Sequence, residues 1–173
     1  MFGWLSWAAV SASRRKRDRI SDRKASSGGR ILTATWRFSR VSRALALENF
    51  HCEAVESLSY PDESFDSVLS IAVLHFARNS DHFHQMVHEM WRVLKPGGIL
   101  FARLGSTIGI EDRVKPLDDA GRFAVPDGST RYLVDMETLA RLTVQLDASL
   151  VEPIKTVNVQ HMRCMTNWVL SKN

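Results

Sequence analysis

The forty residues FDSVLSIAVLHFARNSDHFHQMVHEMWRVLKPGGILFARL, from Phe65 to Leu104, decide the fold of this chain. Their first seven residues, Phe65–Ile71, are mostly apolar and follow a turn sequence, which predicts a buried strand. In Asp81–Leu94 the apolar residues recur at helical spacing, which predicts an amphipathic helix with Ser80 or Asp81 as its N-cap. The chain therefore passes from a buried strand to a helix that covers it.

Lys95-Pro96-Gly97-Gly98 predicts the end of that helix, because proline cannot continue it and glycine accepts the left-handed backbone of a sharp reversal. Ile99–Leu104 then predicts a second strand. A strand, a crossover helix and a second strand form a βαβ unit, which is right-handed in ~98% of cases. We therefore expect an α/β fold with parallel strands.

The sequence after this unit predicts a long connection, one more helix and a hairpin. Residues 105–134 are rich in Gly, Asp, Pro and Ser, and a connection of this length in a compact domain is usually a lid or an insertion. Asp135–Leu146 has a helical apolar face, with Asp135 available as its cap. Ile154–Val159 and Met165–Ser171 are close enough in sequence to form an antiparallel hairpin.

The N-terminal segment differs in kind from the rest of the chain. Residues 1–50 hold 11 Lys and Arg against 3 Asp and Glu, whereas residues 51–173 hold 12 against 16. The basic segment has no sustained apolar period, so we expect residues 1–44 to be a poorly ordered leader and residues 45–173 to be the folded part. A nucleic-acid arm, a patch for anionic membranes and an organelle transit peptide are alternative roles for the leader.

Composition narrows the class of protein. With 45% hydrophobic and 24% charged residues the chain resembles an ordinary globular domain, and no apolar run approaches the ~20 residues that a membrane-spanning helix needs. Cys52 and Cys164 are too few and too far apart for a disulfide framework, which favours a reducing compartment. We therefore expect a cytoplasmic protein without a membrane partner.

Three segments in order carry a family resemblance: EAVESLSYPDESFDSV at 53–68, VLH at 73–75 and EMWRVLKPGG at 89–98. Together they resemble the methyltransferase type 11 family of class I, Rossmann-like S-adenosylmethionine-dependent methyltransferases. The resemblance covers about residues 45–173. It implies a Rossmann-like sheet, incomplete in its N-terminal half, with a C-terminal antiparallel hairpin.

The resemblance also implies a set of site residues. In open parallel sheets, ligands lie across the carboxyl ends of the strands. In this family the segment before the Ser-Phe-Asp strand caps the adenine of S-adenosylmethionine, which here implies Glu53, Ala54 and Val55, although the family's usual Asp position holds Ala54. Ile71 and Ala72 would lie along the methionine and ribose. Core packing is the alternative role for these two residues.

His75 would lie where the cofactor meets the methyl acceptor, as a base or a substrate contact. A structural or helix-capping imidazole is the alternative. The implied reaction is a direct SN2 transfer of methyl from a sulfonium, which depends mainly on in-line approach and needs few catalytic groups. We expect no metal site: His82, His84 and His88 lack the zincin order and are interpreted as a solvated helix face.

One family motif is missing from the sequence. A complete member carries a Gly-rich loop about sixty residues before the Ser-Phe-Asp strand, but Gly28-Gly29 is the only glycine pair upstream and does not follow an apolar strand. Two hypotheses result. The chain is a methyltransferase acting on a small-molecule acceptor, or it is a non-catalytic methyltransferase-like fragment that binds a protein or nucleic-acid partner. The long connection favours the first, with no nucleic-acid partner expected.

Overall fold

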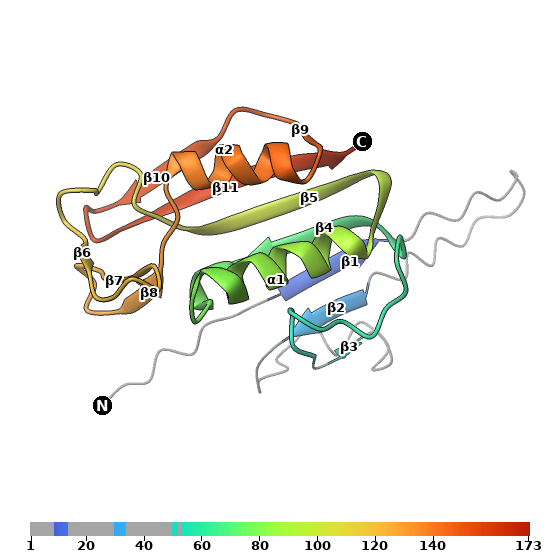
Figure 1. Cartoon of the computed structure of the whole chain (residues 1–173), viewed down its shortest axis with the longest axis horizontal. Helices are drawn as coiled ribbons and strands as arrows, with labels where there is room; N and C mark the ends of the chain where they lie inside the picture. The colour runs from blue at the N-terminus through green and yellow to red at the C-terminus, as the bar shows by residue number, and fades with distance from the viewer. Residues whose placement is uncertain (1–8, 14–29, 34–49, 52) are drawn as a thin grey trace, which may run out of the picture.

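The structure is a computed structural model that describes residues 9–13, 30–33, 50–51 and 53–173. Side chains are described from Glu53 onward. The described residues form an eight-stranded mixed sheet, with a separate three-stranded sheet at one end of it (Figure 1). No helix in the described part of the chain is long and apolar enough to cross a membrane.

The large sheet has the strand order β10-β11-β5-β4-β1-β2-β3, with β9 paired to β11. β4 and β5 are parallel, which confirms the predicted βαβ unit, and β10 and β11 form the predicted antiparallel hairpin. The strands are β1 (Ala9–Ser13), β2 (Arg30–Thr33), β3 (Phe50–His51), β4 (Phe65–Ile71), β5 (Leu94–Ser106), β9 (Ala148–Leu150), β10 (Lys155–Val159) and β11 (Arg163–Lys172).

Two strands lie within the segment expected to be a poorly ordered leader. β1 pairs with β4 and β2 pairs with β1, both antiparallel, while β3 is parallel to β2. Three strands thus occupy the N-terminal side of β4, where the sequence predicted an incomplete sheet. Because β1 runs against β4, its first residue, Ala9, pairs with the last residue of β4, Ile71. The domain boundary near residue 44 stays a prediction.

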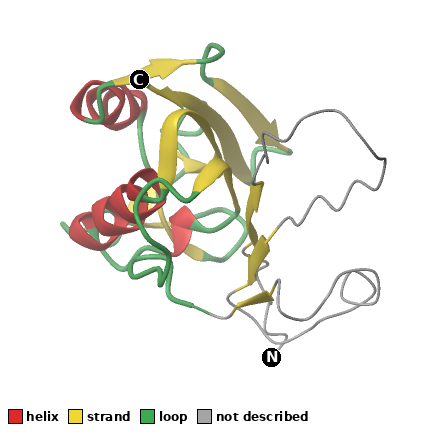
Figure 2. Cartoon of the chain, turned by 90° about the vertical axis from the view of Figure 1, so that its right-hand side faces the viewer, coloured by secondary structure: helices red, strands yellow, loops and turns green. Residues whose placement is uncertain are grey.

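Two helices, α1 (Ser80–Arg92) and α2 (Met136–Gln145), cover one face of the sheet (Figures 1 and 2). Asp135 caps α2 by accepting a hydrogen bond from Thr138 N at 2.8 Å, as predicted. The predicted cap of α1 is wrong. Asn79 rather than Ser80 or Asp81 is its N-cap, because Asn79 has an extended backbone and its side chain accepts from His82 N at 2.9 Å.

The core lies between this helical face and the sheet. Alternate residues of a strand point to opposite faces, and Val68, Leu100 and Ala102 are fully buried beneath the helices. On the other face Ile71 and Ile99 are 37% and 41% exposed. No described helix covers that face, so the described part of the sheet is packed on one side.

The link from α1 to β5 differs in detail from the prediction. β5 begins at Leu94 instead of Ile99, since Leu94 already pairs with Phe65, while Ile99 pairs with Ser67. Residues 95–98 form an irregularity in the ladder between these two pairs. Gly97 has φ +74°, so this turn uses the left-handed backbone that the sequence predicted.

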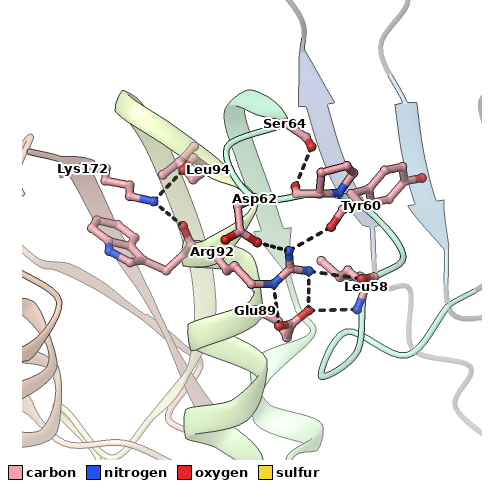
Figure 3. Close-up of polar contacts among 10 residues, drawn as sticks. Leu58, Tyr60, Asp62, Ser64, Glu89, Arg92, Leu94 and Lys172 are labelled. Atoms are coloured by element: carbon pink, nitrogen blue, oxygen red, sulfur yellow. Dashed lines mark hydrogen bonds and ion pairs between the residues drawn. The ribbon is translucent and has the colours of Figure 1, made fainter.

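Arg92 joins the end of α1 to the segment before β4 (Figure 3). Its guanidinium donates to both carboxylate oxygens of Glu89, to Asp62 Oδ1 at 2.7 Å, and to the backbone carbonyl oxygens of Leu58 and Tyr60 at 3.1 and 2.9 Å. Glu89 in turn accepts from Leu58 N at 3.0 Å. One side chain therefore joins the end of α1 to two backbone carbonyls of the loop before β4.

Residues 105–134 form the small three-stranded sheet β6 (Lys115–Pro116), β7 (Arg122–Ala124) and β8 (Thr130–Tyr132). It has its own apolar cluster, which includes Ile110, Val125, Leu133 and Cys164. Cys164 comes from β11, so this cluster attaches the small sheet to the large one. Whether this segment acts as a lid stays a prediction.

Candidate functional site

A cavity of about 240 Å³ lies at the carboxyl ends of β4 and β5, between the large sheet and β6–β8. Its walls come from four places in the sequence. Ala72 and His75 follow β4, Gly105 and Ser106 end β5, the small sheet contributes Val125, Asp127, Arg131 and Leu133, and the β10–β11 hairpin contributes Arg163 and Cys164. Carboxyl ends of parallel strands are where ligands bind in open α/β sheets, so this cavity is the candidate site.

Ala72 forms the bend that leads from β4 into this cavity. It has φ +59°, a left-handed backbone that costs a non-glycine residue about 1–2 kcal/mol. Its N–H donates to Arg103 O at 2.8 Å, which ties the bend to β5. Strain that is held in place by neighbouring structure concentrates at functional sites, and here it sets the direction of the 3₁₀ helix Leu74–Phe76 that carries His75.

His75 is held against the end of β5. Its Nδ1 accepts a hydrogen bond from Gly105 N at 3.2 Å. A Cβ at Gly105 would lie 3.0 Å from Leu133 Cδ2 and 3.3 Å from His75 Cβ, so a side chain there would require these neighbours to shift by a few tenths of an ångström. Because Nδ1 is the acceptor, the neutral ring carries its proton on Nε2. His75 is therefore a hydrogen-bond donor through Nε2 in this arrangement.

The surroundings of His75 favour its neutral form. Burial of the imidazole, together with the charges of Arg131 and Arg163, lowers its pKa from 6.5 to about 4, and Asp127 opposes this shift. A lowered histidine pKa means that the native state binds fewer protons than the unfolded state at pH values between these two pKa values. His75 thus stabilises the fold above about pH 6.5, and this contribution declines as the pH falls toward 4.

We expect the substitution His75→Asn to make stability less sensitive to acid. The asparagine oxygen can replace Nδ1 as acceptor but does not titrate. Between pH 7.5 and pH 5.0 the free energy of unfolding of the wild-type chain should fall by about 2 kcal/mol more than that of the variant. The reason is that the pKa of His75 is about 6.5 in the unfolded chain and about 4 in the folded chain. Urea unfolding of both proteins at the two pH values measures this difference. Equal losses would show that His75 titrates normally.

Three arginines and one carboxylate line the cavity. Arg163 Nη1 lies 3.6 Å from Asp127 Oδ2, and Asp127 also accepts from Ser129 N at 2.9 Å. The guanidinium of Arg131 lies over the Phe76 ring, 4.8 Å from its centroid. The side chain of Arg103, from the end of β5, makes no hydrogen bond or ion pair with the residues that the structure describes. The cavity therefore has an excess of positive charge.

The predicted site residues are brought together only in part. His75 and Ala72 line the cavity, and Ile71 ends the strand beside them. Glu53, Ala54 and Val55 do not line it. Val55 is packed in the main core, Ala54 is exposed, and Glu53 accepts from Ser59 N at 2.8 Å and from Ser59 Oγ at 2.6 Å. The roles of all six residues stay predictions.

The segment of Glu53–Val55 nevertheless lies near the same edge of the sheet. Its next residue, Glu56, places a carboxylate oxygen 2.9 Å from His82 Nε2 and 3.6 Å from Arg78 Nη2. Arg78 and His82 flank the start of α1, which follows the carboxyl end of β4. The loop therefore returns to the edge at which β4 ends.

The histidines of α1 do not share one environment. His82 is buried against Glu56, whereas His88 is exposed, so the interpretation of all three as a solvated face is wrong for His82. Within residues 53–173 no group of three His, Cys, Asp or Glu side chains could hold a metal ion. Cys164 is buried and is a free thiol, and burial raises its pKa, as expected for an inert cysteine. Cys52 lies outside the described residues.

Sequence reasoning missed Arg103, Arg131, Arg163 and Asp127. They belong to β5, β8, β11 and the turn after β7, so no local spacing relates them. The one signal available was the position of Arg103 at the end of a strand predicted to be parallel, since side chains at such ends often meet ligands.

Comparisons with known proteins bear on the fold of this chain. Residues 32–102 match the family model of a methyltransferase domain. No curated protein matches the chain. The matched segment includes β3, β4, α1 and most of β5, and it ends just before the cavity residues Arg103, Gly105 and Ser106.

Solved structures share the fold at low sequence identity. The PH0226 protein from Pyrococcus horikoshii is 18% identical with a TM-score of 0.60, over 77% of this chain and 63% of that one. An S-adenosylmethionine-dependent methyltransferase from Methanosarcina mazei is 21% identical with a TM-score of 0.59, over 71% and 66%. A 1,6-didemethyltoxoflavin-N1-methyltransferase from Burkholderia thailandensis is 15% identical with a TM-score of 0.57, over 77% and 55%. The chain thus spans less than two thirds of each of these proteins.

Proposed function

We propose that this chain, which carries a methyltransferase domain of the class I fold, binds S-adenosylmethionine and transfers its methyl group to a small molecule held in the cavity beside His75. The observation that supports the proposal best is the position of the cavity. It opens at the carboxyl ends of β4 and β5, next to the strand end from which the family resemblance implies a cofactor contact. The Burkholderia relative is described with a small molecule and S-adenosylhomocysteine bound.

The described residues fit one side of the cofactor. Ile71 presents a partly exposed apolar side chain at the end of β4, and the loop of Glu53–Val55 returns to the same edge through Glu56. The neighbouring strand β1 contributes no glycine loop at this edge among the described residues, since it runs against β4. We therefore expect weak cofactor affinity.

The mechanism needs little from the protein beyond position and exclusion of water. When bound, the cofactor supplies an electrophilic methyl group on a positive sulfur. The bend at Ala72 and the hydrogen bond from Gly105 hold His75 at the cavity wall, where Nε2–H donates to an oxygen or nitrogen of the acceptor and orients it. The apolar cluster of Ile110, Val125 and Leu133 excludes water from the acceptor side.

A titration with S-adenosylmethionine and S-adenosylhomocysteine tests cofactor binding directly. A ligand at about a hundred times its Kd should stabilise the chain by about 2.7 kcal/mol, which raises Tm by roughly 5–11 °C in a domain of this size. Calorimetry gives the Kd from the same sample. A folded sample that shows neither heat nor a Tm shift would contradict the proposal and favour the alternative, a non-catalytic fragment that binds a partner.

Two isoleucines on adjacent strands provide a matched pair of variants. Ile71→Lys adds a positive charge at the carboxyl end of β4, where the positive sulfonium would bind, and should weaken S-adenosylmethionine binding by about tenfold or more. Ile99→Lys adds the same charge to a similarly exposed residue of β5, on the same face but toward the opposite edge. It should leave the Kd unchanged. Equal effects of the two variants would count against a cofactor site at the end of β4.

A further inference from the structure

We propose that the acceptor is a small organic anion, whose carboxylate or phosphate group binds between the guanidinium groups of Arg103, Arg131 and Arg163. This inference rests on the proposed function, because it names the substrate class of the same cavity. Nothing in the shared fold implies it, since all three arginines lie outside the matched residues 32–102.

The balance of charge in the cavity is the first argument. Three guanidinium groups face a single carboxylate, that of Asp127, which lies beside Arg163 and is partly satisfied by Ser129. Like charges gathered at a partly enclosed site repel each other, and an anionic ligand removes that cost. A neutral or cationic acceptor would leave the positive charge unbalanced. The cavity therefore selects for negative charge.

The hydrogen-bond donors that remain available give the second argument. Among the described residues, the guanidinium of Arg103 has no partner, and no acceptor is found for Nε2–H of His75. Arg131 uses one N–H on Thr130 O at 2.8 Å, and its guanidinium lies over the Phe76 ring, 4.8 Å from the centroid, which restricts its movement and leaves further donors. A planar fork held in this way suits bidentate binding of a carboxylate or a phosphate.

His75 adds an uncharged hydrogen-bond donor to the three positively charged arginines. Its ring carries the proton on Nε2, because Nδ1 accepts from Gly105, and its lowered pKa keeps it uncharged at neutral pH. A ring in this state cannot act as a base through Nε2. His75 therefore contributes a hydrogen bond to the bound anion and does not remove a proton from the acceptor.

The dimensions and the apolar floor limit the size of the anion. A volume of about 240 Å³ is just below the ~300–1,000 Å³ of typical ligand sites. Ile110, Val125 and Leu133, which belong to one apolar cluster, also line the cavity. A compact molecule with one anionic group and an apolar body, such as an aromatic acid, matches both the charged and the apolar lining residues.

Benzoate, its uncharged analogue benzamide and inorganic phosphate are suitable probes for a nuclear magnetic resonance titration of the full chain without cofactor. We expect benzoate or phosphate to shift the amide signal of Gly105 and the Nε–H signals of Arg103 and Arg131. Benzamide should bind at least about tenfold more weakly than benzoate. The substitutions Arg103→Gln and Arg131→Gln should each weaken anion binding by about tenfold, as expected for loss of a charge-assisted hydrogen bond.

Arg141→Gln is the matched control, because Arg141 is an exposed arginine of α2 outside the cavity, and it should leave anion binding unchanged. Thermal unfolding of each variant checks that it is folded. The proposal is overturned if benzamide binds as tightly as benzoate, if neither anion binds, or if Arg141→Gln weakens binding as much as the cavity variants. A titration with S-adenosylhomocysteine on the same samples separates this result from cofactor binding. Anion binding without cofactor binding would remove the proposed function and keep the anion site.

Discussion

Replacing Trp168 with alanine should lower the free energy of unfolding by about 3–5 kcal/mol, the usual range for truncation of a buried aromatic side chain. Trp168 is fully buried on β11, opposite Ala102 of β5, and belongs to the main core. Its indole N–H donates to Thr143 Oγ1 at 3.0 Å, and that hydroxyl donates to Leu139 O at 2.8 Å. The side chain therefore joins the centre of the sheet to α2 by packing and by a hydrogen bond.

Urea unfolding followed by circular dichroism measures this loss without relying on the tryptophan signal. Val144→Ala is a suitable control, because Val144 lies on the same helix, α2, with its side chain 79% exposed, and it should change stability by less than about 0.5 kcal/mol. A Trp168→Ala loss below about 1.5 kcal/mol would contradict the packing described for β11 and α2.

The second large effect is expected at Arg92. The substitution Arg92→Ala removes five hydrogen bonds and leaves the carbonyl groups of Leu58 and Tyr60 without these donors. The hydrogen bond from Arg92 holds the pKa of Glu89 below its ordinary value, so this carboxylate also loses its main stabilising partner. Because these bonds act together and the guanidinium is partly exposed, we expect a loss of about 2–4 kcal/mol, well below their sum.

Arg92→Lys separates geometry from charge. Lysine keeps the positive charge but lacks the planar fork, so most of the loss should remain. Arg141→Ala, which removes an exposed arginine from α2, should cost less than about 0.5 kcal/mol. The same urea experiments provide the comparison. If lysine restored the full stability of the wild type, the network of Figure 3 would be acting through charge alone.

Elements with a strong local pattern were predictable from the sequence. The bounds of β4 are those that the apolar run predicted, and Asp135 caps α2 as its position suggested. The error at the start of α1 is also local, because Asn79, Ser80 and Asp81 are all good capping residues and only the backbone geometry selects Asn79. The early start of β5 depends on pairing between Leu94 and Phe65, which sequence alone does not show.

Of the residues that line the cavity, only those that follow β4 could be predicted from the sequence. His75 and Ala72 were found because they follow the strand that carries the family resemblance. The arginines lie far apart in sequence and meet only when the small sheet and the β10–β11 hairpin fold onto the ends of β4 and β5. Gly105 shows the same limit, since its closeness to His75 depends on a contact across thirty residues.

The position of β11 has a consequence for synthesis on the ribosome. β11 pairs with β5 along eight residues, from Cys164 with Ser106 to Ser171 with Ile99, yet β5 ends at Ser106 and β11 is synthesised only from Arg163 onward. Until then one edge of β5 has no strand beside it, and α1 lacks Lys172, whose ammonium donates to the carbonyl oxygens of Trp91 and Leu94. Unpaired edges of this kind invite association with other chains. Nascent chains arrested before residue 163 should therefore depend more on chaperones than those in which β11 has emerged.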